Sequence, residues 1–167
     1  MFQNAIIEDF PEGFFEGLDG VTSLYSVFES AVFMKPLKGG MFKGMAKANT
    51  LNNAFYRTNV TELPEDLFEG MGASSTSISL QSAFFGCEEL ASIPAGLFDP
   101  IETKVNNISN CFKNCTGLKS IPEGFGNSLT ALTNASNAFY GCEALETLPS
   151  EMFKGAAEKL SNLSSMF

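Results

Sequence analysis

The sequence predicts an α/β repeat fold: a solenoid (superhelix) of about six coils of 26–29 residues, each formed by a short strand and short helical turns. Three observations support this prediction. A phenylalanine recurs at a nearly constant spacing, a string ending in proline recurs between these phenylalanines, and the chain contains 17 Phe residues, which need a structural role. A fixed period of about 20–50 residues is typical of solenoids and propellers.

The repeat is marked by an apolar residue followed by an anchor phenylalanine. The anchors, at successive steps of 26, 27, 29, 28, 27 and 28 residues, are Phe2, Phe28, Phe55, Phe84, Phe112, Phe139 and Phe167. A second apolar–Phe pair follows in most units, ending at Phe15, Phe42, Phe68, Phe98 and Phe153. Because a single unit cannot bury its own rings, stacked units are needed. We therefore expect Phe84, Phe112 and Phe139 to be buried and stacked on one another.

The stretch NASNAFYGC, residues 134–142, predicts a short helix at the anchor. Its apolar residues Ala135, Ala138, Phe139 and Cys142 would share one helical face. Five positions before the anchors stand residues that cap helix N-termini well: Ser23, Thr50, Ser79, Asn107, Asn134 and Asn162. Two positions after the anchors stand residues that tolerate a left-handed helix end: Asn4, Gly86, Asn114 and Gly141.

The proline strings IEDFP, VTELP, LASIP, LKSIP and LETLP predict very short strands. Proline has no N–H to donate, so it suits the end of a strand. Segments such as PEDLFEG then predict a one-turn helix, with proline first and glycine last. The second unit is irregular, because in FMKPLKGGMF Pro36 precedes the usual apolar Leu37 and Lys38 replaces proline. The fifth unit loses one residue at PEGFGNS.

The amino-acid composition argues against several classes of function. The chain has 10 basic and 19 acidic residues, a net charge of -9, which disfavours nucleic acid and anionic membranes as partners. No apolar run reaches the roughly 18 residues needed for membrane insertion. The absence of His excludes Ser-His-Asp and Cys-His catalysis and His-ligated metals. We predict no enzymatic activity, no cofactor and no metal, and the N-terminus MFQNAIIEDF does not have the pattern of a signal peptide.

The phrase AFYGCEALETLP resembles the BspA-like leucine-rich repeats of bacterial surface proteins, whose units follow the pattern F-x-x-C-x-x-L-x-x-I-x-P. One match lies at Phe84, Cys87, Leu90, Ile93 and Pro94, and two more begin at Phe112 and Phe139. The resemblance covers essentially the whole chain and is weakest over residues 28–53. It implies a leucine-rich-repeat-type superhelix, extracellular or cell-surface localisation, and adhesion to host or neighbouring-cell proteins.

The cysteines Cys87, Cys115 and Cys142 occupy one repeat position, three residues after an anchor. A buried column of free thiols filling a small slot is the interpretation we favour, since free Cys behaves as a small hydrophobe. A disulfide is an alternative, with Cys111 as one candidate partner, because equivalent positions of stacked coils lie within bridging distance. A metal site at Cys111 and Cys115 is a further alternative without His support.

A candidate ligand surface lies between the apolar residues of the proline strings. These positions vary in charge and size while their neighbours stay constant, as expected of residues that do not pack in a core. The candidates are Glu8, Asp9, Lys35, Thr61, Glu62, Ser92, Lys119, Ser120, Glu146 and Thr147. The chain is predicted to bind a protein or glycan ligand through this exposed sheet face.

Two functions remain open: an interaction and adhesion module, or a passive spacer or stalk segment of a larger surface protein. We expect residues 1–167 to be a single repeat array and a segment of a longer repeat protein, because both ends read as internal repeat text. Uncapped terminal coils would expose apolar surface and strand edges, which predicts end-to-end self-association.

Overall fold

Regular secondary structure is sparse in the computed structural model, which describes the whole chain, residues 1–167. Its elements are β1 (Ile6–Ile7), β2 (Val32–Phe33), β3 (Ile78–Ser79), η1 (Asp99–Ile101), β4 (Val105–Asn107) and η2 (Lys154–Ala156), the two η elements being 3₁₀ turns. β1 pairs with β2 and β3 pairs with β4, both in parallel, as two separate sheets. No α-helix is present, and no helical element is long and apolar enough to cross a bilayer.

The predicted fold class is therefore wrong. The chain does not form an α/β leucine-rich-repeat-type solenoid of about six coils, each with a short strand and short helical turns. Segments expected to be helical, such as residues 134–142, are successions of turns. The proline strings supply only isolated bridging residues, such as Ser92, Ser120 and Thr147. The one-turn helices expected after proline are also turns, apart from the short η1 and η2.

Left-handed residues on both sides of each anchor explain why no helix forms there. The backbone angle φ is between 50° and 58° two positions before the anchor, at Ser26, Asn53, Ser82, Asn110, Asn137 and Ser165. It is between 54° and 75° two positions after the anchor, at Asn4, Ser30, Arg57, Gly86, Asn114 and Gly141. A right-handed helix needs a φ of about −63° at every residue, so it cannot continue through either position.

Hydrogen bonding around the anchors alternates between two kinds of partner. Every second N–H donates to the chain near the next anchor, at 2.7–3.0 Å: Leu24 to Thr50, Ser26 to Asn52, Phe28 to Ala54 and Ser30 to Tyr56. The intervening N–H groups close turns, donating three residues back: Val27 to Leu24, Glu29 to Ser26 and Ala31 to Phe28. An α-helix would use all of these N–H groups internally. Contacts with the next repeat take the place of the helix.

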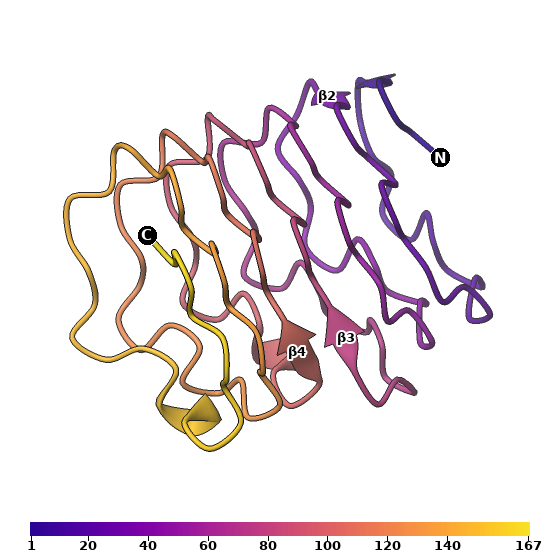
Figure 1. Cartoon of the computed structure of the whole chain (residues 1–167). Coiled ribbons are helices and arrows are strands. Elements are labelled where there is room, and N and C mark those ends of the chain that lie inside the picture. Colours follow the sequence, from indigo (N-terminus) through magenta and orange to yellow (C-terminus); the bar gives the residue numbers. More distant parts are fainter.

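Two columns of phenylalanine rings form the core. The anchor rings from Phe2 to Phe167 stack face to face, with neighbouring centroids 5.3–5.9 Å apart. A second column runs from Phe15 to Phe153 at 5.6–6.2 Å. The prediction for Phe84, Phe112 and Phe139 is confirmed, since their exposed fractions are 0%, 0% and 1%. Successive repeats accordingly lie side by side from the indigo N-terminal end to the yellow C-terminal end (Figure 1).

The predicted helix-capping residues do not cap helices. They form a line of parallel bridges, Ser23–Thr50–Ser79–Asn107–Asn134–Asn162. Four of them still accept a hydrogen bond from the N–H two residues ahead, at 2.9–3.3 Å: Ser23, Asn107, Asn134 and Asn162. The local capping chemistry is therefore present, but it stabilises the start of a turn.

Candidate binding face

All ten residues of the predicted ligand surface are exposed. We number the repeat units by their anchors: unit 1 from Phe2, unit 2 from Phe28, unit 3 from Phe55, unit 4 from Phe84, unit 5 from Phe112 and unit 6 from Phe139. The ten residues, which we call the strip, are Glu8 and Asp9 of unit 1, Lys35 of unit 2, Thr61 and Glu62 of unit 3, Ser92 of unit 4, Lys119 and Ser120 of unit 5, and Glu146 and Thr147 of unit 6. Parallel bridges join Ser92 to Ser120 and Ser120 to Thr147.

Backbone hydrogen bonds tie most of the strip together. We call them the strip ladder: Met34 N–H donates to the carbonyl of Ile7 at 2.9 Å, Ala91 to Thr61 at 3.2 Å, Lys119 to Ala91 at 3.1 Å and Glu146 to Lys119 at 3.1 Å. Each bond joins one unit to the unit before it. The bond that would join unit 3 to unit 2, from Thr61 N–H to the Met34 carbonyl, is absent. Backbone bonds therefore join the strip at every junction between successive units except the junction between units 2 and 3.

Charge on the N-terminal part of the strip is paired. Asp9 accepts hydrogen bonds from Lys35 at 2.9 Å and from Lys38 at 3.0 Å. The Lys35 ammonium, followed by that of Lys38, lowers the pKa of Asp9 from 3.8 to about 2. Asp9 therefore stays ionised at neutral pH and holds the Lys35 ammonium toward unit 1.

A cavity of about 200 Å³ opens at the interruption in the strip ladder. It is lined by the strip residues Lys35, Thr61 and Glu62 and by two residues outside the strip, Asn59 and Glu89. Apolar side chains of units 2 and 3 complete its wall. The structure thus places three of the ten predicted residues around one concave site and leaves the others on the open face.

Asn59 is the residue of this site that sequence reasoning missed. Its side-chain oxygen accepts from Phe33 N–H at 2.8 Å, and its side-chain nitrogen donates to the Phe33 carbonyl at 3.0 Å. The carboxamide therefore bonds to unit 2 as the backbone of a neighbouring strand would. The sequence signal near this contact was the irregular second unit, since Phe33 lies three residues before Pro36.

The cysteines lie inside the fold, away from the strip. All four are buried and free, so the disulfide alternative is not formed. The thiols of Cys87, Cys115 and Cys142 point to the carbonyls of Phe55, Phe84 and Phe112, at sulfur–oxygen distances of 3.1–3.2 Å. The expected column of buried thiols is confirmed. Burial raises the pKa of Cys87 to about 12 and that of Cys142 to about 11, which keeps both thiols protonated at neutral pH.

Replacing Cys87 with Ala is expected to weaken the loss of stability at alkaline pH. The unfolded chain releases this proton near pH 9 but the folded chain only near pH 12, so the stability due to the neutral thiol declines as pH rises between these values. The slope is up to about 1.4 kcal/mol per pH unit for one thiol. Urea unfolding at pH 8, 9 and 10 should give a flatter profile for Cys87→Ala than for wild type. Alanine suits the site, because Ala31 is buried at the same repeat position. Parallel profiles would contradict the prediction.

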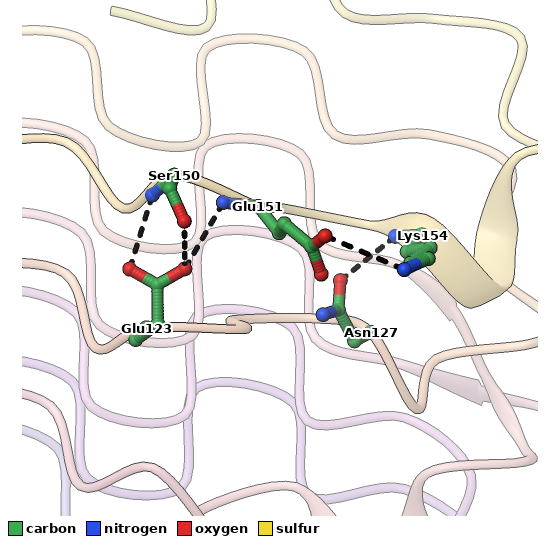
Figure 2. Close-up of polar contacts among 5 residues, drawn as sticks. All are labelled: Glu123, Asn127, Ser150, Glu151 and Lys154. Atoms are coloured by element: carbon green, nitrogen blue, oxygen red, sulfur yellow. Dashed lines mark hydrogen bonds and ion pairs between the residues drawn. The ribbon is translucent and has the colours of Figure 1, made fainter.

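A second polar cluster connects units 5 and 6 (Figure 2). The Glu123 carboxylate accepts from the Ser150 hydroxyl at 2.6 Å, from Ser150 N–H at 3.0 Å and from Glu151 N–H at 3.1 Å. These bonds, the Ser150 hydroxyl first, lower the pKa of Glu123. Asn127 accepts from Lys154 N–H at 2.8 Å beside it. Because Glu123 is satisfied within the chain, we interpret this cluster as a clamp between units.

Several large apolar side chains are exposed, both in the terminal units and in unit 2. The exposed fraction is 81% for Met1, 73% for Ile6, 64% for Met34 and 56% for Leu148, and it is 46% for the terminal Phe167. A shallow hollow of about 320 Å³ beside Phe167 also includes Phe139 and Leu148. End-to-end self-association of the chain stays a prediction.

The residues of this chain offer no ready-made metal centre. No group of three or more His, Cys, Asp or Glu side chains is arranged to hold a metal ion, Cys111 and Cys115 included. A comparison with protein-family models found none that matches this chain, and a comparison with curated proteins found no match.

Proposed function

We propose that this chain is a non-enzymatic interaction and adhesion module that binds a protein ligand through the strip. The observation that carries the proposal is that the ten variable positions, taken from six repeats, are all exposed and lie along the strip ladder, which joins every pair of successive units except units 2 and 3. Side chains such as Lys119 and Glu146 have no packing role there, whereas the anchor rings beneath them are buried. A broad surface with variable charge on a constant scaffold suits recognition of another protein.

The BspA-like repeat motif supports the rest of the proposal. The three matching segments, which begin at Phe84, Phe112 and Phe139, resemble repeats of bacterial surface proteins that adhere to other cells. On this basis we propose that the chain acts at a cell surface or outside the cell. The alternative is a passive spacer, and it would be favoured by a strip that binds nothing.

Selection of random peptides displayed on phage against the full chain tests the proposal. The strip variant carries Lys35→Ala, Glu62→Ala, Lys119→Ala and Glu146→Ala. The control variant carries Lys43→Ala, Glu69→Ala, Glu158→Ala and Lys159→Ala, exposed residues outside the strip with the same net charge change. We expect selected peptides to bind wild type and control equally and the strip variant at least about tenfold more weakly, as for loss of several contact residues.

Two results would contradict this proposal. Selected peptides that bind the strip and control variants equally would place the binding surface elsewhere on the chain. Selections that yield no specific peptide would favour the passive spacer. Circular dichroism of both variants checks that the fold is unchanged.

A further inference from the structure

The interruption in the strip ladder leaves one hydrogen-bond donor and one acceptor without partners. Thr61 N–H and the Met34 carbonyl, which would pair if the ladder were continuous, make no hydrogen bond within the chain. Every other junction between successive units has a backbone bond in the strip ladder, at 2.9–3.2 Å. Met34 and Thr61 are both exposed, so these two backbone groups are open to solvent and can pair with an outside group.

The gap lies beside the irregular second unit. Pro36 precedes Leu37, and Lys38 stands where other units have proline. The Asn59 carboxamide of unit 3 is bonded to both backbone polar groups of Phe33 in unit 2. This side chain shows which chemistry fits the gap, because a carboxamide has the same donor and acceptor as a peptide bond. The Met34 carbonyl and Thr61 N–H, which follow Phe33 and Asn59 along their segments, have no carboxamide bonded to them.

The space at the gap is large enough for part of a peptide. Met34 and Thr61 both line the cavity of about 200 Å³, together with apolar side chains such as Phe33, Leu37 and Val60. One water molecule occupies about 30 Å³ in the liquid, so the cavity exceeds a single bridging water severalfold. An apolar wall beside unpaired backbone groups suits a short extended segment that presents an apolar side chain.

The charge around the cavity is negative. Glu62 and Glu89 line it, and neither forms an ion pair. Lys35 also lines it, but its ammonium is paired with Asp9 at 2.9 Å. An adjacent hollow that shares Glu89 adds the acidic Glu88 and the basic Arg57. A basic side chain on the ligand would therefore find unpaired carboxylates.

We propose that the cavity between units 2 and 3 binds an extended peptide segment of alternating basic and apolar residues, whose backbone amide completes the strip ladder between Met34 and Thr61. This inference rests on the proposed function and specifies where on the strip, and by which chemistry, the ligand docks. Main-chain hydrogen bonds supply the pairing, as in the addition of a strand to an open sheet edge. Glu62 and Glu89 select the basic side chains.

The probe is a capped hexapeptide in which Lys and Val alternate, titrated into ¹⁵N-labelled full chain. We expect the amide signal of Thr61 to shift, because its N–H gains an acceptor. The same peptide N-methylated at alternate amides should bind at least about threefold more weakly, as for loss of one hydrogen bond. Glu62→Gln and Glu89→Gln should each weaken binding by about two- to fivefold, and the matched control Glu158→Gln should not.

Several results would overturn this inference. An unmoved Thr61 signal would mean that only water fills the cavity. Binding of the N-methylated peptide as strong as that of the unmethylated peptide would contradict the main-chain pairing, and equal binding of a Glu–Val hexapeptide would contradict the selection of basic side chains. A Thr61 shift caused by the N-acetylglucosamine trimer and not by the peptide would assign the cavity to a glycan. If the Lys–Val peptide fails while phage-selected peptides still depend on the strip, this inference falls and the proposed function stands. If selected peptides ignore the strip, the proposed function falls as well.

Discussion

Phe112→Ala is expected to lower the free energy of unfolding by about 3–5 kcal/mol, the usual cost of removing a buried phenylalanine ring. The ring is fully buried. It stacks on Phe84 at 5.4 Å and on Phe139 at 5.6 Å, and the edge-on ring of Phe125 lies at 6.3 Å. Its removal interrupts the anchor column and leaves a cavity that neighbouring units cannot fill without moving. Urea unfolding followed by circular dichroism measures the loss.

Tyr140→Ala is the matched control for this experiment. Tyr140 follows the anchor Phe139, but its ring is 46% exposed and contacts the Lys113 ammonium at 4.8 Å. We expect a loss of no more than about 1 kcal/mol, the range for an exposed cation–π contact. Similar losses for Phe112→Ala and Tyr140→Ala would show that the anchor column does not dominate stability.

Gly44→Ala is expected to destabilise the chain by about 2–4 kcal/mol, for two reasons that add. The backbone at Gly44 has a φ of +90°, which is unfavourable for a residue with a side chain. An added Cβ would also lie 2.9 Å from Glu16 Cα and 3.0 Å from the Phe15 carbonyl oxygen, so units 1 and 2 would have to separate. Thermal unfolding by circular dichroism measures the effect.

Two other glycines separate these causes. Gly17 has a φ of +81° and no atom within 4 Å of an added Cβ, so Gly17→Ala should show the backbone strain alone, about 1–2 kcal/mol. Gly20 has neither feature, and Gly20→Ala should change stability by less than about 0.5 kcal/mol in magnitude. An equal effect of Gly44→Ala and Gly17→Ala would contradict the role given to close packing between units.

Burial could be predicted from the sequence because it depends on residue type and spacing. The apolar residues Ala135, Ala138, Phe139 and Cys142 are all buried, as the helix interpretation required. A succession of turns buries the same four positions, so the correct prediction of their burial did not establish that the segment is a helix. Asn114 and Gly141 were correctly expected to tolerate a left-handed backbone, although no helix ends there.

The choice between helix and turns was decided by contacts between units. Ser82 and Asn137, on the other side of the anchors, are also left-handed, and their N–H groups donate to Ser109 and Ser164 of the next repeat at 2.9 Å. Such bonds need a partner about 28 residues away. Serine and asparagine at these positions favour caps and turns, but this local preference does not specify a hydrogen-bond partner in the next repeat.

The sequence by itself determined the period, the residues of the phenylalanine columns except Phe125, the buried thiols and the exposure of the ten strip residues, because each follows from apolar or polar character repeated at fixed spacing. Only the tertiary structure decided that the anchors lie in turns and that the strip ladder is interrupted at Thr61. Both depend on where backbone N–H groups find carbonyl partners. Every residue except proline carries the same N–H, so side-chain identity alone does not specify its distant partner.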